Sequence, residues 1–306
     1  MADFYVGLTG SVQLDDVRIT EELKTQFILA YRQANVMDAL AEWNYDMNAK
    51  SVSFARYPQL ANGETPLNER EEVDSEQMSD SAISFTPVEY GNVVSLTNLA
   101  VLQSGGRDAM AAMQLIGQNM ATTRNKLAIA AVEGSSNSTD KAGAIITPTA
   151  LNQVYNKLAR ANVPKHSATG TYVAIMHDDV IHDLREGSSA GSWEDVNKYN
   201  NELPVLMNEV GMYKGFRIVR NNDCSVTENG TGSPAEPDDY ISSFIGFNAF
   251  GLAESQMPEI RITGPFDKLG RFVNVGWYGV FKYGLIEPSA TQLLVTGSSV
   301  ATNPGS

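Results

Sequence analysis

The spacing of apolar positions predicts one long helix and two shorter ones. Residues 107–133 are followed by the stop residue Gly134, and at ~1.5 Å per residue they form a spine of about 40 Å. Shorter helices are predicted over 148–162, with proline at the first helical position, and over 178–186, which begins with two acids. The apolar face of the long helix is predicted to be Ala109, Met113, Ile116, Met120, Leu127 and Ala131.

Alternating or fully apolar short runs predict strands. Val52 and Phe54 share one face of a strand over 51–57, and a second alternating run covers 81–86. Strand and helix alternate in the middle of the chain, which predicts an α/β part, and the C-terminal part is rich in strands. The remaining predicted strands are 171–176, 215–219, 240–247, 259–263, 271–286 and 292–296.

Other segments have less regular patterns. A helix is predicted to start at Thr20, with two acids in its first turn. The apolar run over 93–102 predicts a buried segment, and 135–143 is predicted to be a polar loop. Two further polar stretches, 187–201 and 221–239, interrupt the pattern.

Residues 58–80, the acidic segment, lie between the two alternating strands. They contain seven acidic side chains and one basic side chain, Arg70. A polar connection of this length is uncommon inside a compact domain. It is therefore either a disordered tip or, as the strand-like flanks favour, an extended arm that packs on another surface.

Composition narrows the class of protein. The 306 residues carry a formal net charge of −14, which argues against a nucleic-acid reader with a basic footprint and is equally explained by solubility. With Cys224 as its single cysteine, the chain forms no intrachain disulfide, which fits a reducing cytoplasm. Residues 1–14 lack the pattern of a signal peptide, and no run approaches the ~18 apolar residues of a membrane span.

Candidate chemistry is sparse. Gly187-x-Ser189-x-Gly191 has the form of a nucleophile elbow, but a predicted helix precedes it and all three histidines come before Ser189. His177 and His182 with their neighbouring acids are metal-capable, yet a spacing of five does not place two ligands on one helix face. We interpret that cluster as a strand-to-helix junction with an acidic cap. No catalytic, cofactor-binding or metal residue is predicted.

Four stretches in order resemble one known family. They are VEYGNVVSLTNLAVL (88–102), YVAIMHDDVIHDLR (172–185), GMYKGFRIV (211–219) and FDKLGRFVNVGWYGVFKYGLI (266–286). Their order and spacing resemble the major capsid proteins of tailed bacteriophages, of the type first seen in phage Hong Kong 97, and in particular the branch of the phage N4 coat protein. The resemblance covers about residues 50–290.

The resemblance implies an α+β, Hong Kong 97-like major capsid fold in five parts. These would be an N-terminal arm, an extended hairpin called the E-loop, a peripheral domain with the spine helix, an axial α/β domain, and the return strands of the peripheral domain with a C-terminal tail. The corresponding ranges are 1–49, 50–90, 91–140, 141–256 and 257–306.

The same resemblance implies an assembly function without enzymatic activity or cofactor. Copies of the chain would form hexamers and pentamers of an icosahedral shell around double-stranded DNA, in a virion made in a bacterial cytoplasm. Further partners would be a portal, decoration proteins and, where one is used, a separate scaffolding protein; no membrane is implied. Trp193 is an interface anchor in one interpretation and packs within its own domain in the other. The predicted contacts with a neighbouring subunit are Glu64, Glu69, Arg70, Glu71, Glu72, Asp74 and Trp193.

One departure from the family is informative. Some relatives cross-link their shells through an E-loop lysine, but residues 51–89 contain no lysine, so no such isopeptide bond is expected. The alternatives are an encapsulin-like nanocompartment shell, a serine hydrolase using Ser189 and a secreted binding module. The absent signal pattern and the missing disulfides disfavour the last of these.

Overall fold

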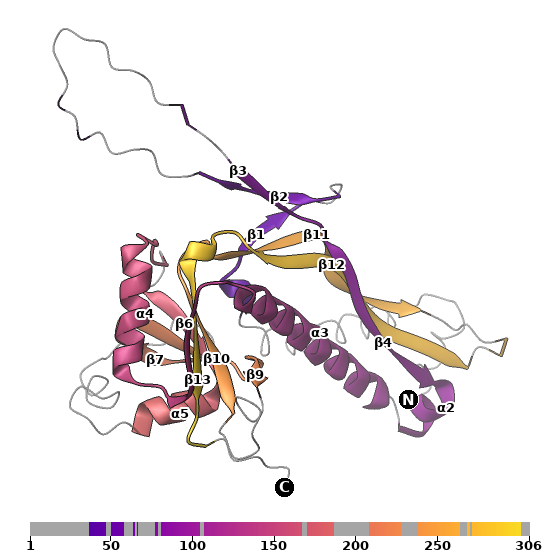
Figure 1. Ribbon diagram of the computed structural model, residues 1–306. Coiled ribbons are helices and arrows are strands. Elements are labelled where there is room, and N and C mark those ends of the chain that lie inside the picture. The colour runs from indigo at the N-terminus through magenta and orange to yellow at the C-terminus, as the bar shows by residue number, and fades with distance from the viewer. Residues whose placement is uncertain are drawn as a thin grey trace.

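The computed structural model describes residues 37–46, 50–57, 64, 66, 77–78, 81–104, 107–166, 170–186, 208–227, 238–263, 268–269 and 271–300. Two sheets dominate the described part of the chain (Figure 1). The predicted helix starting at Thr20 lies outside the described residues. No helix in the described ranges is both long and apolar enough to cross a membrane.

The first sheet has four strands in the order β1-β11-β12-β4. Strand β1 runs parallel to β11, while β12 is antiparallel to both of its neighbours. The two central strands are 14 residues long, more than twice the usual ~5–6. The strands are β1 (Glu42–Tyr45), β4 (Val88–Thr97), β11 (Phe250–Thr263) and β12 (Phe272–Leu285).

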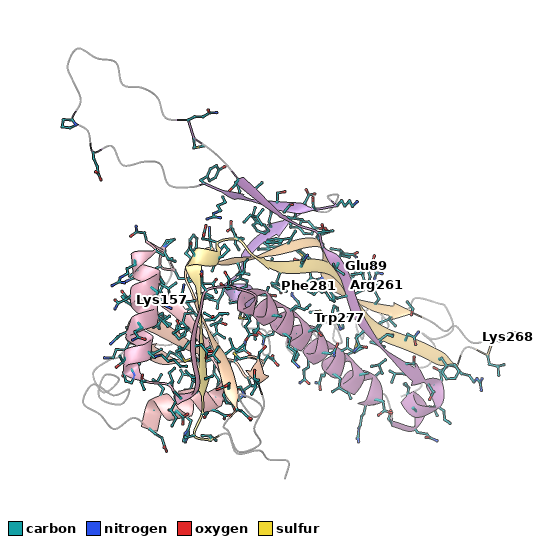
Figure 2. The ribbon with its side chains drawn as sticks, in the orientation of Figure 1. Glu89, Lys157, Arg261, Lys268, Trp277 and Phe281 are labelled. Atoms are coloured by element: carbon teal, nitrogen blue, oxygen red, sulfur yellow. The ribbon has the colours of Figure 1, made fainter. Side chains whose placement is uncertain are left out.

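Helix α3 (Arg107–Glu133) packs along one face of this sheet and confirms the predicted spine. Trp277 and Phe281 of β12 are buried on that face (Figure 2), and the Trp277 indole donates to Asn119 Oδ1 at 3.0 Å. Short helix α2 (Asn98–Ser104) links β4 to α3. The 3-10 helix η2 (Met37–Ala39) also packs on α3, burying Met37.

The buried stripe of α3 agrees with the prediction only in part. Met113, Ile116 and Met120 are buried as predicted, but Ala109, Leu127 and Ala131 are only half-buried. The buried positions in the second half are Arg124, Asn125, Ala128, Ile129 and Val132. These positions continue the stripe of the first half, where Ala112, Gly117 and Ala121 are also buried, so the covered side is the same along the helix and Leu127 and Ala131 lie beside it.

The second sheet has seven strands, six of them in the order β5-β13-β10-β6-β8-β7, with β9 paired to β10. Helices α4 (Pro148–Arg160) and α5 (Asp178–Glu186) flank it. The strands are β5 (Ser138–Ile145), β6 (Tyr172–Met176), β7 (Glu209–Tyr213), β8 (Phe216–Arg220), β9 (Val226–Thr227), β10 (Asp239–Ile245) and β13 (Thr291–Gly297).

Local sequence explains the α/β elements. All five residues of β6 are buried, as expected of an apolar strand covered on both faces. The Thr147 hydroxyl accepts a hydrogen bond from the Ala150 backbone N–H at 3.3 Å, and Pro148 follows at the first helical position of α4. The predicted helices over 148–162 and 178–186 and the predicted strand over 171–176 are thereby confirmed.

The prediction of a polar loop over 135–143 was wrong. Ser138, Thr139 and Asp140 belong to β5, which pairs in parallel with β13. β5 stands at the edge of the seven-stranded sheet and is mostly exposed, so its polar side chains do not have to be buried. β13 pairs with β10 in this sheet, although the predicted ranges 141–256 and 257–306 put the two strands in different parts of the chain. The five-part division stays a prediction.

Strands β2 (Val52–Arg56) and β3 (Ser81–Phe85) form a separate two-stranded antiparallel hairpin. They confirm both strands predicted on either side of the acidic segment. Figure 1 shows β3 leading into β4, so that the hairpin extends from the four-stranded sheet. The 3-10 helix η3 (Pro288–Ala290) turns the chain from β12 into β13.

Candidate assembly surfaces

The base of the β2–β3 hairpin is fixed to the body by a small apolar cluster. Val52 and Phe54 are buried against Ala253 of β11 and Ile286 after β12, with Phe85 of β3 packed beside them. The Phe54 and Phe85 ring centroids are 5.6 Å apart. A two-stranded hairpin is marginally stable alone, so this cluster is what holds the root of the acidic segment in place.

The structure places few of the predicted contact residues. Glu64 is exposed. The remaining predicted positions lie outside the described residues, so their contacts stay a prediction. These positions are Glu69, Arg70, Glu71, Glu72, Asp74 and Trp193.

A buried arginine of the spine helix α3 joins the 3-10 helix η2 to strand β11 of the four-stranded sheet. The Arg124 guanidinium of α3 is 2.9 Å from Glu254 Oε1 on β11 and 3.0 Å from Asp38 Oδ2 on η2. Its Nε donates to the Tyr283 hydroxyl at 3.1 Å. The Trp43 indole of β1 also donates to Glu254, at 2.9 Å, so residues 37–45 are part of the packed subunit.

The segment over 93–102 was predicted to be buried, and the structure contradicts this. Val93 is 58% exposed, Leu99 65% and Leu102 56%, and α2 has no buried residue. Met110 at the start of α3 is also exposed. We name Leu99, Leu102 and Met110 the distal apolar surface, since α2 contacts α3. Val93 lies on the sheet face away from α3, because the neighbouring Asn92 side chain bonds Asn119 of α3.

Strand order leaves β4 open beside this surface. β4 is the last strand of its sheet, so within the described residues nothing pairs with its outer edge. The sequence of β4 and α2 does not indicate this exposure, because an apolar run predicts burial whether or not another element covers it. Apolar surface left open in a subunit is typical of sites where another protein binds.

The sheet face away from α3 carries a short charged group. Arg261 of β11 lies 4.0 Å from the Tyr278 ring centroid and donates to Glu259 Oε1 through Nε and Nη2. Loss of hydration and the nearby Glu89 carboxylate raise the pKa of Tyr278. Figure 2 shows Glu89 and Arg261 close together at β4 and β11.

The candidate metal cluster is a helix cap. The Asp179 backbone N–H donates to His177 Nδ1 at 3.3 Å, and the Tyr240 hydroxyl donates to Asp179 Oδ2 at 2.6 Å. Asp183 instead accepts hydrogen bonds from the backbone N–H and hydroxyl of Ser299. In the described ranges no three His, Cys, Asp or Glu residues are grouped to hold a metal ion.

The nucleophile candidates have little support. Ser189 and its flanking glycines lie outside the described residues. Cys224 is 5% exposed, and burial together with the nearby Glu133 and Asp223 carboxylates raises the pKa of its thiol. A buried thiol with a raised pKa is a poor nucleophile.

Comparison with known proteins shows which fold this chain has. No protein-family model matches the chain, and no curated protein matches its sequence. Among solved structures, the capsid of Ralstonia phage GP4 is 12% identical, with 90% of this chain and 92% of that chain covered and a TM-score of 0.71. The head structure of Helicobacter pylori bacteriophage KHP40 gives 12% identity, 87% and 91% coverage and a TM-score of 0.62.

A virus-like particle from Pyrococcus furiosus is also similar, at 12% identity, 90% and 98% coverage and a TM-score of 0.58. These similarities span nearly the whole of each chain. The protein therefore has the mixed α+β fold of tailed-phage capsid subunits, as predicted. The resemblance to the phage N4 branch stays a prediction.

Proposed function

We propose that this protein is a major capsid protein, which assembles into hexamers and pentamers of an icosahedral head shell around double-stranded DNA. The observation that carries the proposal is the shared fold over 90% of this chain and 92% of the GP4 capsid chain. It acts as a structural protein without cofactor, in a virion assembled in a bacterial cytoplasm.

The open surfaces of the subunit support assembly. The distal apolar surface lies beside α2, whereas the acidic segment is joined to the β2–β3 hairpin. The two are therefore at different places on the molecule. Rings close through head-to-tail contacts, which join two different surfaces of the same chain. In this proposal the acidic side chains from Glu64 to Asp74 contact lysines or arginines of the next subunit, and Trp193 anchors the ring centre.

The first test is the particle state of the protein. Expressed alone and together with the neighbouring genes of its genome, the protein should sediment as rings or closed shells that negative-stain imaging resolves. A strict monomer under both conditions would contradict the proposal. Co-purification from immature shells tests for a separate scaffolding protein, a portal and decoration proteins.

The content of the particles separates two kinds of shell. A head shell isolated from infected cells should contain double-stranded DNA that resists nuclease until the particle is opened. An encapsulin-like nanocompartment, the alternative, would contain cargo protein and no genome. Fluorophosphonate labelling tests the hydrolase alternative, and we expect no label at Ser189.

We also predict that the shell is not cross-linked through the hairpin. Residues 51–89 contain no lysine, so this segment has no amine that could form an isopeptide bond. Mature particles boiled in denaturant should therefore run as a single band near 33.2 kDa. A ladder of covalent multimers on the gel would show the prediction to be wrong.

A further inference from the structure

Strand β4 is an edge strand without the features that usually protect an edge. Natural sheets discourage pairing with other chains through short edge strands, bulges, prolines and charges, lysine above all. β4 is ten residues long, and its ladder with β12 has no register shift. Its sequence, VEYGNVVSLT, contains no proline and no cation, and Glu89 is its single charge. No described strand pairs with its outer side.

The other three ends of the two large sheets have such protection. β1 is only four residues long. The ladder of β5 with β13 has a register shift, and β5 also carries Lys141 and Gly143 at φ +71°. The ladder of β7 with β8 is likewise irregular between Glu209 and Gly211. The contrast indicates that the outer side of β4 is kept open for pairing.

Alternate backbone groups of β4 point away from the sheet. The Asn98 N–H, directly after β4, donates to the Arg271 carbonyl at 2.9 Å, so even-numbered residues bond to β12 and odd-numbered residues point outward. The Val93 N–H agrees with this, because it donates to the side chain of Asn92 at 2.8 Å. The outward-pointing backbone groups are those of Glu89, Gly91, Val93 and Ser95.

The side chains of β4 suit a partner strand of the same sequence. Val93 is the most exposed apolar side chain of the strand, at 58%. Two β4 strands related by a two-fold axis run antiparallel, and with the axis at Val93 the two valines lie opposite each other. Pairs of β-branched residues across an antiparallel ladder are favourable, whereas like charges directly opposite are not.

The single charge of β4 is compatible with this register. Glu89 of one copy lies opposite Thr97 of the other, since both are four residues from Val93. The two Glu89 positions are then eight residues apart along the ladder, which is about 27 Å at ~3.4 Å per residue. The paired strands therefore bring no two charges together.

The symmetry of such a pair suits a shell. Head-to-tail contacts close a ring but do not join it to the next ring. A contact between the same patch on two copies is two-fold symmetric, and an antiparallel pair of identical strands has that symmetry.

We infer that β4 of one copy pairs with β4 of a second copy, antiparallel and with Val93 at the two-fold axis, and that this pairing joins neighbouring rings. The inference rests on the proposed shell function and adds a contact separate from the hairpin. The four-stranded sheets of the two copies form one continuous sheet. The Val93 N–H exchanges Asn92 for a backbone carbonyl, while the Asn92 amide keeps its bond to Asn119 of α3.

Cross-linking at Val93 tests the pairing. Opposed residues of a hydrogen-bonded antiparallel pair have Cα atoms about 5.5 Å apart, within the range that a disulfide spans. Oxidised particles of Val93→Cys should therefore run mainly as a covalent dimer on a non-reducing gel. The natural Cys224 is buried, so oxidised particles of the natural protein should run as the 33.2 kDa monomer.

Ser95→Cys is the matched control. Ser95 is exposed and lies on the same face of the same strand. In this register the two Ser95 positions are four residues apart along the ladder, about 14 Å, which is too far for a disulfide. Ser95→Cys should stay monomeric. Equal cross-linking of the two variants would overturn the inference.

A charge at the same position separates ring formation from ring joining. Val93→Lys puts two cations opposite each other, so the yield of closed shells should fall at least about tenfold while ring-shaped oligomers persist. Val93→Thr keeps a β-branched side chain and should form shells normally. Because position 93 is exposed, the midpoint of urea unfolding should stay the same in both variants. A normal yield of closed shells from Val93→Lys would contradict the inference.

The cross-link also distinguishes failure of this inference from failure of the proposed function. Oxidation of the soluble Val93→Cys chain traps even brief pairing. A covalent dimer from a chain that forms no particles would support the pairing and count against the shell alone.

Particles that form without a Val93→Cys dimer would overturn the inference and leave the shell standing. Amide exchange in those particles then identifies the reason. Protected amides at residues 89–95 would show that β4 pairs with another segment of the chain or with a separate protein. Rapid exchange there would show that the edge stays open.

Discussion

At the scale of single residues, Arg124 of α3 joins η2, β11 and β12 at one buried point. Its guanidinium is 5% exposed and contacts carboxylates from two other elements, Asp38 and Glu254. It also lies 4.9 Å from the Phe281 ring centroid. A buried charge of this kind is stable only while its partners remain, so the N-terminal segment, α3 and β11 are coupled at one point.

Removing the cation should therefore be costly. Arg124→Met leaves two carboxylates without their cation, one of them buried, and should lower the free energy of unfolding by about 3–5 kcal/mol in urea denaturation. The matched control is Arg220→Met, since the Arg220–Asp178 pair is solvent-exposed and should cost less than ~1 kcal/mol. Equal losses in the two variants would contradict the proposed coupling.

A second residue makes stability depend on pH. Burial lowers the pKa of His166, whose Nε2 has no hydrogen-bond partner and whose ring stacks edge-on against Phe247. The unfolded chain then takes up the proton at a higher pH than the folded chain. The stability contribution is thus complete above the unfolded pKa of ~6.5 and is lost as the pH falls through the folded pKa.

His166→Phe should remove this component. Urea midpoints measured between pH 8 and pH 5 should fall more steeply for the natural protein than for the variant. His182→Phe is the control, because His182 is half exposed, with 51% of its side chain accessible. If the two variants shift the pH profile equally, burial of His166 is not the cause.

At the scale of elements, the hairpin shows how a short ladder is stabilised from outside. β2 and β3 share five residue pairs, too few to be stable alone, and their apolar side chains pack on β11 and the end of β12. Gly284 of β12 is part of this fit, because a Cβ there would lie 2.2 Å from the Phe85 ring. The hairpin therefore depends on contacts that its own sequence does not reveal.

Phe54→Ala should release the hairpin from the body. The lost burial and the resulting cavity cost about 3–5 kcal/mol at a packed site. Amide exchange should speed up in both β2 and β3 while α4 keeps its protection. Ser53→Ala, on the exposed face of the same strand, should leave exchange unchanged. Faster exchange throughout the molecule would instead indicate global unfolding.

At the scale of the whole molecule, apolar side chains remain open at the surface. The core spans both sheets and α3, yet the distal apolar surface remains open. α2 illustrates this: a helix of seven residues is too short to be stable by itself in water, and none of its residues is fully buried. Assembly with further copies would supply the missing cover.

Leu102→Ser tests this cover. An exposed substitution should change subunit stability by no more than about 0.5 kcal/mol. Assembly should nevertheless fail, as measured by the fraction of protein that sediments as particles. Gln103→Ser, at the neighbouring exposed position, is the control and should assemble normally. Normal particles from Leu102→Ser would show that this surface stays open in the assembled state.

The sequence by itself determined the local elements of this protein. The helical spacing of Met113, Ile116 and Met120 fixed α3, and the threonine–proline pair fixed the start of α4. Such elements can be predicted because the periodicity and the capping residues lie within the element itself.

Only the tertiary structure decided what covers each element. β4 reads as buried but is an edge strand, and β5 reads as a loop but pairs with β13, because strand order depends on partners far away in the chain. Arg124 finds its partners 86 residues before it and 130 residues after it, since 124 − 38 = 86 and 254 − 124 = 130. Such long-range pairings minimise the free energy of the whole fold, and no local window of sequence contains them.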